Sequence, residues 1–527
     1  MDVETRTGLR LEVAGRELSA CRGPQPGRRP GAGRHLLGLP ALLLLVFLLV
    51  PMIWTVVWAL RGDPPLIGNF AAILTDPEAL TAGWHSLLWV GIALALVAAG
   101  YGLALLSRTV SGLWRVLLYV LILPFGVSAM VSGAVFRIIF DPNPERGLAV
   151  ALFGEVVWLG PELIWVVLAS AFAWTWLGFI VVLFRAGLAA NPGGRRPGPI
   201  VTIVVLTVSI AAIRVFDLVL IVPPGSVQAD ADVVGLHWWR MVSRSADTGG
   251  PAALAVLLFV VVAAMALAGQ RAARPTGATN PDPVREPAAP ARHRTWSWLI
   301  GLGVGLVWLL PVVILLATAL HDPAAAGAAG WWRPEGLGFG SFVALAESWL
   351  WPALVGNLFL TGLATALVVA AAAPAAYLLV WGGLPRWLSN ALTVLLVVLA
   401  VAPVQMYAGP LGAAVSGLGL SGSRTPLALI HAAAGLPFAI LVLRTAFEAA
   451  GVRPQDERPS LDAIWRRTRY RPALIAVLVL EFVLVWNDFI VGFLISGGST
   501  PFTLLLWGEA RQFGASAGTV AAGAVAA

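Results

Sequence analysis

The sequence contains no lysine, and all 34 of its basic residues are arginine. A phosphate-binding P-loop needs a Gly-Lys-Ser/Thr run, because its lysine reaches the β- and γ-phosphates of the nucleotide. This chain therefore cannot form a P-loop. If nucleotide hydrolysis drives the protein, a separate chain must carry it out.

Cysteine and histidine are also scarce. The single cysteine, Cys21, excludes an internal disulfide and argues against a thiolate metal site. The six histidines show no spacing typical of metal ligands: His35, His85, His237, His293, His321 and His431. We therefore expect no metal, no cofactor and no catalytic residues on this chain.

Charge is the third deficit. Only 12% of the residues are charged, whereas 59% are hydrophobic and the mean hydropathy is +0.85. Apolar runs of membrane-spanning length recur along the chain, which predicts a polytopic protein embedded in a lipid bilayer. A net charge of +7 would suit a nucleic-acid partner, but most arginines lie in loops between the apolar runs. Orientation signals belong in those loops, so we expect no nucleic-acid partner.

The apolar runs define the expected fold class, an all-α integral membrane protein with about 11–12 transmembrane helices. A last apolar run, residues 515–527, is too short to cross a hydrocarbon core of ~30 Å as a helix. We therefore expect the last helix to be truncated or missing. The expected spans are residues 36–60, 87–107, 116–140, 163–184, 200–222, 252–267, 296–320, 354–380, 387–407, 426–443 and 472–495.

Arginine placement predicts the orientation and the division of the chain. Arginines concentrate in the N-terminal tail and in alternate loops, so the positive-inside rule places the N-terminus in the cytoplasm. A segment rich in Pro, Ala and Arg has the composition of a flexible linker between two halves of similar layout, which predicts parallel repeats. Twelve helices without common descent are the alternative. The expected parts are a cytoplasmic tail at 1–35, a first half at 36–268, a cytoplasmic linker at 269–295 and a second half at 296–527.

A charged segment, AFEAAGVRPQDER at 446–458, lies between two apolar runs on the predicted cytoplasmic side. Ala449 and Ala450, after Glu448, would let a short helix approach another protein closely, since no bulky side chain holds the two apart. Gly451 would end that helix, and Ile464 precedes an arginine-rich return to the membrane. An ordinary basic loop is the alternative reading.

Nearly the whole chain after residue 36 resembles the permease subunits of binding-protein-dependent ABC sugar importers of the maltose type. In the second half the resemblance rests on VLAVAPVQMYAGPLGAAVSGLGL, LALIHAAAGLPFAILVLRTAFEAAG and LVLEFVLVWNDFIVGFLISGGSTPFTLLL, which look most like the α-glucoside branch. The first half is similar to the partner permease in NFAAILTDPEALTAGWHSLLWV, VLLYVLILPFGVSAMVSGAVFRIIFDP and RVFDLVLIV.

The resemblance implies two permease subunits fused in one chain, with the type I transmembrane-domain architecture, in the plasma membrane of a bacterium. It implies a dimer of cytoplasmic ABC ATPase subunits, an extracytoplasmic solute-binding protein and a sugar substrate as partners. It also implies that Glu448, Ala449, Ala450, Gly451 and Ile464 form an ATPase-coupling loop.

The coupling segment departs from the family pattern. Pro454 stands where the family has glycine, and Arg466-Arg467 stand where it has Leu-Pro. An alternative alignment places PQDE at 454–457 in the approach to a deleted loop. In the first half, FRAGLAANP at 184–192 and GGRRPGPIV resemble the entry and exit of a coupling loop whose middle is missing.

Polar residues within the apolar runs are candidates for a translocation path, because such residues usually face the bundle interior or a wet path. Arg214 and Asp217 are three apart, which would place them on one helix face. Amide, carboxyl and aromatic groups suit the hydroxyls and C–H faces of sugars, and helix packing through hydrogen bonds is the competing role. The candidates are Arg214, Asp217, Glu481, Trp486, Asn487 and Asp488, with Gln405 and Asn357 the weaker ones.

The resulting functional hypothesis is the membrane-spanning permease of an ATP-driven importer of an α-glucoside-like sugar. Two alternatives remain open, a secondary transporter with two six-helix halves and a degenerate permease that no longer transports.

Overall fold

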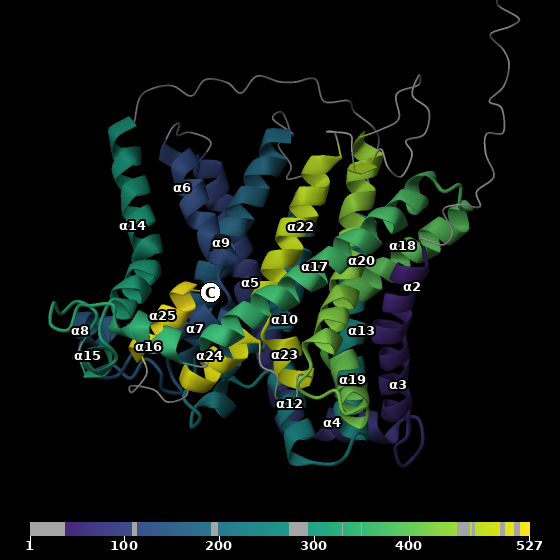
Figure 1. Cartoon of the computed structure of the whole chain (residues 1–527), viewed down its shortest axis with the longest axis horizontal. Coiled ribbons are helices and arrows are strands. Elements are labelled where there is room, and N and C mark those ends of the chain that lie inside the picture. Colours follow the sequence, from purple (N-terminus) through teal and green to yellow (C-terminus); the bar gives the residue numbers. More distant parts are fainter. Residues whose placement is uncertain are drawn as a thin grey trace, which may run out of the picture.

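The structure is a computed structural model that describes residues 37–107, 113–190, 199–272, 294–328, 330–348, 350–450, 464–465, 470–495, 501–510 and 517–526. Within these ranges the chain is helical and forms no β-strand, although one isolated antiparallel bridge joins His321 to Leu337. The all-α fold class predicted from the sequence is confirmed (Figure 1).

The helices of the first half follow the apolar runs, with short helices in the connections between them. Local chemistry fixes several of their ends: the Asp76 side chain accepts a hydrogen bond from the Glu78 amide, and Pro77 occupies the first turn of its helix. These helices are α2 (Gly38–Leu44), η2 (Leu45–Leu49), α3 (Val50–Leu60), α4 (Gly68–Thr75), α5 (Pro77–Leu106), α6 (Leu113–Ile122), η4 (Leu123–Gly126), α7 (Ala129–Ile139), α8 (Leu148–Phe153), α9 (Ile164–Ala190), α10 (Pro199–Ile213), α11 (Asp217–Ile221), η5 (Gln228–Ala231), α12 (Val234–Arg244) and α13 (Gly249–Ala272).

The second half begins with a long helix and continues in a comparable order. Its helices are α14 (Arg294–Ala319), α15 (Pro323–Ala328), α16 (Gly340–Glu347), α17 (Leu350–Trp381), α18 (Arg386–Ala400), α19 (Gln405–Gly417), α20 (Arg424–Ala450), α22 (Arg471–Trp486), α23 (Ile490–Ile495), α24 (Phe502–Ala510) and α25 (Ala517–Ala526).

Among the described residues, eight helices are long and apolar enough to cross a membrane, or ten spans if each of two bent helix pairs is counted as one. The expected span at 472–495 is divided, because α22 has 16 residues and ends before Asn487. A helix of that length rises ~24 Å, less than the ~30 Å of a hydrocarbon core. The final apolar run forms α25, a helix of 10 residues.

The two halves repeat the same packing between corresponding helices, which confirms the predicted half-repeats. In the first half α5 packs on α9 and α10, and in the second half α17 packs on α20 and α22. Likewise α13 packs on α3 and α4, and α25 packs on α14 and α16. The 10-residue α25 therefore occupies in the second half the place that α13 has in the first.

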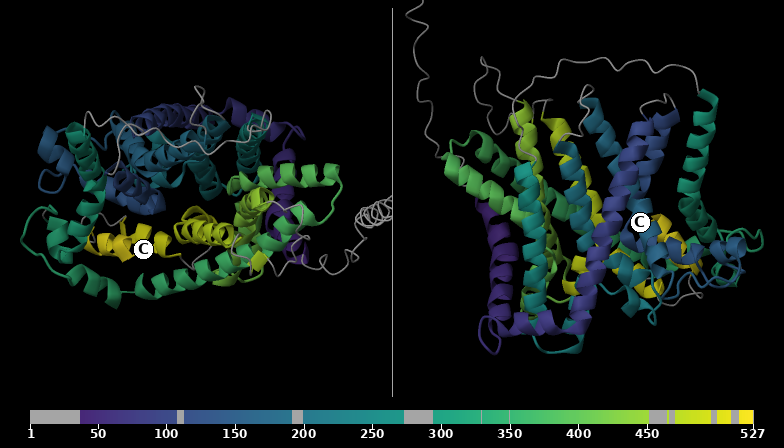
Figure 2. Two further views of the ribbon diagram at one scale, coloured as in Figure 1. Left: turned by 90° about the horizontal axis from the view of Figure 1, so that it is seen from above. Right: turned by 180° about the vertical axis from the view of Figure 1, so that it is seen from behind.

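The halves exchange their outer helices. The first-half helices α3 and α13 pack on α19 of the second half, whereas the second-half helices α14 and α25 pack on α7 of the first. Figure 1 accordingly shows α3 at one end of the molecule and α14 at the other. Seen from above in Figure 2, the first-half and second-half helices form two adjoining rows.

Hydrogen bonds connect the two halves at both ends of the molecule. The Thr55 hydroxyl of α3 donates to the Met406 carbonyl of α19 over 2.7 Å. At the other end, Trp174 Nε1 donates to the Trp308 carbonyl over 2.9 Å, and Trp308 Nε1 donates to the Leu121 carbonyl over 3.2 Å. These donors satisfy carbonyl groups across the boundary between the halves.

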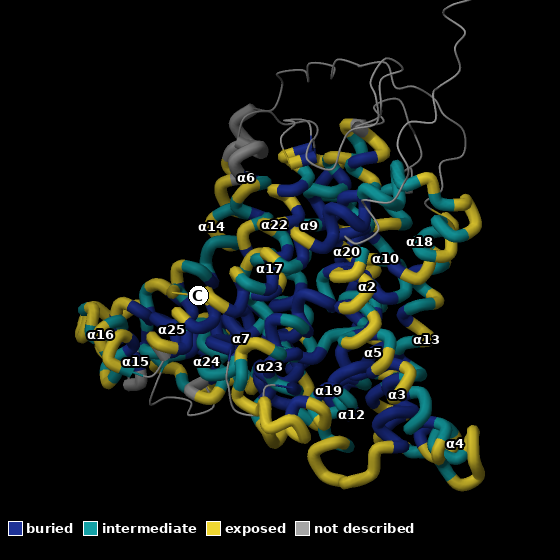
Figure 3. The backbone as a smooth tube through the Cα atoms, turned by 45° about the vertical axis from the view of Figure 1, so that its right-hand side comes forward, coloured by how far each residue is buried: buried dark blue, intermediate teal, exposed yellow. Residues whose placement is uncertain are grey.

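The burial pattern matches helices packed in a lipid environment. Buried residues run through the middle of the bundle, whereas exposed residues gather at its rim and on the short helices (Figure 3). Many exposed side chains on the long helices are large and apolar, including Leu42, Trp84 and Val307. A solvated surface would favour polar groups at these positions, but lipid tails favour apolar ones.

Candidate functional site: a polar seam between the halves

Each half has an interrupted helix near the boundary between the halves. In the first half the helical path is broken between α10 and α11, where Phe216 adopts φ −142° and ψ −59°. Arg214 and Asp217 stand on either side of this break. The prediction that they share one helix face is wrong, because the non-helical Phe216 removes the i, i+3 relation that it assumed.

The second half has a corresponding interruption between α22 and α23. Trp486 ends α22, Asn487 caps it, and Asp488 precedes α23. The Asp488 carboxylate accepts hydrogen bonds from the Val491 and Gly492 amides over 3.4 and 3.2 Å. Asp488 is therefore held at the start of α23, where its carboxylate satisfies amides that have no helical partner.

A third interruption brings Gln405 and Tyr407 to the same region. Helices α18 and α19 meet at an angle of 78°, with Pro403 in the connection between them. Gln405 opens α19 and is buried, and its Nε2 atom lies beside Gly235 of α12. The same glycine borders the carbonyl of Val215, within the α10–α11 break. Gln405 of the second half thus lies close to the interrupted helix of the first.

The charged groups of the two breaks face one another across the boundary. Arg214 lies within electrostatic range of Tyr407, and Asp217 lies within electrostatic range of Asp488. His431 of α20 joins them, with its Nε2 atom 3.6 Å from Asp488 Oδ2. We call these five residues, Arg214, Asp217, Tyr407, His431 and Asp488, the polar seam.

Asn487 links the second-half break directly to a bent helix pair of the first half. Its Nδ2 atom donates a hydrogen bond to the Gly126 carbonyl over 2.7 Å. Gly126 ends η4, at the point where the first bent helix pair turns by 107°. Backbone groups freed by a broken helix need such partners within a membrane protein. The seam is therefore a meeting point of interrupted helices from both halves.

A cluster of aromatic rings lies next to the seam. Phe493 contacts Phe216 and Trp239 of the first half at centroid distances of 6.0 and 5.2 Å. It also stacks on Phe489 at 5.3 Å and meets Trp507 edge-on at 5.4 Å. This cluster adds apolar contacts between the halves, next to the polar contacts of the seam.

Glu481 is buried in α22, with an exposed fraction of 1%, and its Oε2 atom lies against Gly435 of α20, one helical turn after His431. Trp486 lies at the end of α22, and its carbonyl accepts a hydrogen bond from Asn357 over 3.4 Å.

The coupling-loop candidates lie far from the seam, at the end of α20. Glu448, Ala449 and Ala450 are the last residues of this 27-residue helix, not part of a separate short helix. The Glu448 side chain is half exposed and accepts a hydrogen bond from Arg444 Nε over 2.8 Å, whereas Ile464 is fully buried. Gly451, the PQDE segment at 454–457 and residues 191–198 of the first half lie outside the described residues.

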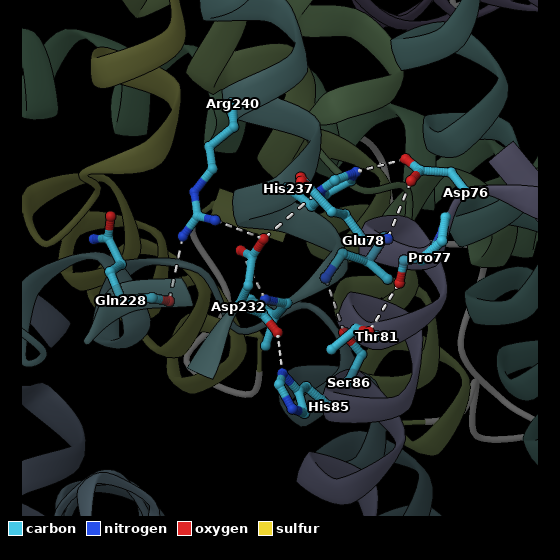
Figure 4. A network of polar contacts seen from close by, with 12 residues as sticks. Asp76, Pro77, Glu78, Thr81, His85, Ser86, Gln228, Asp232, His237 and Arg240 are labelled. Atoms are coloured by element: carbon cyan, nitrogen blue, oxygen red, sulfur yellow. Dashed lines mark hydrogen bonds and ion pairs between the residues drawn. The ribbon is translucent and has the colours of Figure 1, made fainter. Parts of the chain in front are cut away.

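A separate polar network lies in the first half, where the start of α5 meets α12 (Figure 4). The buried His237 of α12 places its two ring nitrogens 3.4 Å from Asp232 Oδ2 and 3.7 Å from Asp76 Oδ2. Arg240 pairs with Asp232 at 3.0 Å, and His85 Nδ1 donates to the Asp232 carbonyl over 2.8 Å. In the described part of the chain, no group of three or more His, Cys, Asp or Glu is arranged to hold a metal ion.

His431 and Tyr407 belong to the seam but were not among the residues predicted from the sequence. His431 is one of six scattered histidines, although an ionisable residue within an apolar run is itself a sign of a functional position. Tyr407 stands at the end of an expected span, where an aromatic residue is ordinary. Only the bend between α18 and α19 reveals that it faces the other half.

No family model matches the chain. Several curated relatives do. The chain is 28% identical over 226 residues to an osmoprotective compounds uptake permease protein, GgtD, of Synechocystis, covering 39% of this chain and 74% of the relative. It is 25% identical over 260 residues to the α-glucoside transport system permease protein AglF of Rhizobium meliloti, covering 42% of this chain and 77% of the relative.

A probable ABC transporter permease of Pyrococcus horikoshii is 23% identical over 269 residues, covering 42% of this chain and 91% of the relative. The curated relatives of this chain are ABC transporter permeases, which are transport proteins and not enzymes. Each relative aligns with about two-fifths of this chain, and most of the relative's own length is covered.

Among solved structures, a bacterial ABC transporter for import of the acidic polysaccharide alginate aligns with a TM-score of 0.40 and 19% identity, over 46% of this permease and 94% of that chain. The alginate transporter in complex with a periplasmic protein bound to an alginate pentasaccharide aligns with a TM-score of 0.39 and 18% identity.

Proposed function

We propose that this permease is two importer subunits fused in one chain, which move a sugar-like, hydroxyl-rich solute along the polar seam. The observation that carries the proposal is the seam itself, where interrupted helices of both halves present Arg214, Asp217, Tyr407, His431 and Asp488 to one another. Transport sites in repeat-built carriers commonly lie between the repeats and are formed by discontinuous helices.

The side chains of the seam suit a neutral polyhydroxylated solute. Carboxylate groups can accept from sugar hydroxyls, phenol and imidazole groups can donate or accept, and the guanidinium group can donate. One relative bears a name that agrees with this, an α-glucoside transport system permease. The aromatic cluster around Phe493 would close the seam on one side while the other side is open.

Energy would come from a pair of separate ATPase subunits, because this chain has no lysine for a P-loop. The exposed Glu448 at the end of α20 is the proposed contact with one of them, and a solute-binding protein would deliver the substrate on the opposite face. On this proposal the N-terminus is cytoplasmic. Closure of the ATPases would then rock the exchanged halves against each other and open the seam alternately.

The test is solute uptake into proteoliposomes that contain the permease, its candidate ATPases and its candidate binding protein. We expect ATP-dependent uptake of an α-glucoside, and Asp488→Asn should lower its rate by at least about tenfold, because a charge facing the path is lost. Glu347→Gln is the matched control, since Glu347 is exposed on α16 and should leave uptake unchanged.

A second variant separates transport from coupling. Glu448→Arg should abolish co-purification of the ATPases while the permease still reaches the membrane. Uptake driven by a proton gradient without ATP would support a secondary transporter instead. Failure of uptake together with failure to bind any ATPase would support the degenerate permease and contradict the proposal.

A further inference from the structure

Each half carries a short helix directly after its first spanning helix, and one hydrogen bond holds each short helix in place. In the first half, Asn69 Nδ2 of α4 donates to the Ala59 carbonyl at the end of α3 over 3.0 Å. In the second half, the Ser341 hydroxyl of α16 donates to the carbonyl of His321, two residues after the end of α14, over 2.6 Å. The two short helices are therefore fixed against the ends of α3 and α14.

These bonds also determine which face of each short helix is turned to the bundle. Ile73 of α4 and Leu345 of α16 each lie four residues after the anchoring polar side chain, and both are buried. In the right-hand view of Figure 2, α4 lies crosswise to the long helices at the lower edge of the bundle. The face of α4 that points away from the bundle is thus left without a protein contact.

That outward face is apolar in both halves. Leu74 of α4 and Val343 of α16 are exposed, and the N-cap residues Ile67 and Phe339 are 62% and 70% exposed. Neither N-cap side chain makes a capping hydrogen bond. In water an N-cap position favours a polar residue such as serine or aspartate. A large exposed apolar residue at the same position of both short helices indicates a neighbour other than water.

The adjoining surfaces indicate what this neighbour is. Exposed apolar side chains such as Ile53 of α3 and Val313 of α14 continue the lipid-facing surface up to the two short helices. The helices that follow them, α5 and α17, carry the exposed Trp84 and Trp351 near their starts. Tryptophan is enriched at the boundary between lipid and water. The apolar faces therefore lie at the edge of the lipid-facing surface.

A partner protein is the competing cover for these faces. Figure 1 shows α4 beside α3 and α16 beside α14, toward opposite ends of the molecule. A single partner would have to reach both ends at once to keep the two faces out of water. A bilayer surrounds the whole molecule and meets both ends equally.

We propose that α4 and α16 are a matched pair of interfacial helices whose outward apolar faces lie in the boundary between the lipid headgroups and acyl chains. An interfacial helix ordinarily turns its polar face to water. Here the opposite face packs on the bundle instead, through Ile73 and Leu345. The proposal concerns the bilayer alone and does not rest on the proposed transport function.

The experiment places one fluorescent label at a time on the full chain in lipid nanodiscs, where both faces of the bilayer can be reached. Cys21→Ser removes the only thiol, so Ile67→Cys and Phe339→Cys can each be labelled singly with a polarity-sensitive fluorophore. We expect aqueous iodide to quench both labels at least about threefold less than a label in water, because the interface shields them. Lipids that carry a nitroxide near the headgroup should quench both labels.

Ala246→Cys is the matched water control. Ala246 is exposed in the polar connection before α13, and it belongs to the same face of the molecule because Gly249 lies against the Asn69 side chain of α4. Its label should respond to iodide and not to the nitroxide lipid. Leu306→Cys, exposed within α14, is the lipid control, and a nitroxide deep in the acyl chains should quench its label most strongly.

Three outcomes would overturn the proposal. The first is iodide quenching at positions 67 and 339 that equals the quenching at 246. The second is shielding that develops only after a candidate solute-binding protein is added, which would assign the surface to that protein. The third is shielding at one end alone, since the two helices are proposed as a pair. If either cysteine variant does not fold, Leu74→Cys and Val343→Cys decide by the same criteria.

Discussion

The buried His237 makes polar contacts that hydropathy alone does not predict. It stands between the carboxylates of Asp76 and Asp232, and it connects the start of α5 with α12 (Figure 4). Asp232 is held in turn by Arg240 and through its carbonyl by His85. The ring nitrogens of His237 form no hydrogen bond with a described residue, so the side chain contacts the two carboxylates at ion-pair distance only.

Replacement of His237 by alanine should therefore destabilise the protein more than its size suggests. The change leaves the buried Asp232 with fewer partners, which costs about 1–3 kcal/mol. We expect a lower unfolding midpoint in detergent. Arg244→Ala, on the exposed end of the same helix, is the control and should leave the midpoint unchanged. An equal loss in both variants would contradict a special role for His237.

The sequence identified part of the seam at this scale and missed the rest. Arg214, Asp217, Asn487 and Asp488 could be found because a charged or amide side chain within an apolar run is unusual. Glu481 met the same criterion, but the criterion does not say which helix face a residue occupies.

At the scale of helices, sequence predicts spans better than it predicts their interruptions. Apolar length marked α5, α9 and α20 because lipid requires about 20 apolar residues. It did not mark the breaks at Phe216 and Asn487, since both lie in runs that stay apolar on either side. Broken helices depend on partners from elsewhere in the chain, such as the Gly126 carbonyl that accepts from Asn487.

Close approach between helices is a further property that only the fold reveals. Gly178 of α9 lies so near the Leu121 carbonyl of α6 that a Cβ atom would overlap it. Gly178→Ala should therefore push α9 away from α6 and lower the unfolding midpoint, because a backbone atom cannot move aside as a side chain can. Gly91→Ala is the matched control, since nothing lies within 4 Å of a Cβ there. A similar effect of both changes would contradict this close contact.

At the scale of the whole molecule, the repeat was visible in the sequence but the exchange of outer helices was not. Matching order of spans predicts two similar halves, and it says nothing about which helix packs on which half. In the structure α3 and α13 also pack on α19 of the second half, and α14 and α25 also pack on α7 of the first. The polar seam lies between halves that are thereby held together from both ends.

This exchange predicts that the covalent link between the halves is dispensable for their association. A protease site inserted between Ala272 and Arg294 should allow complete cleavage while the two fragments still co-purify in mild detergent. The packing of four exchanged helices and the hydrogen bonds of Thr55, Trp174 and Trp308 remain after the cut. Cleavage within the first half, between α4 and α5, is the control for protease access. Separation of the fragments on size-exclusion chromatography would show that the exchanged helices do not hold the halves together, whereas a single peak that contains both would support the arrangement.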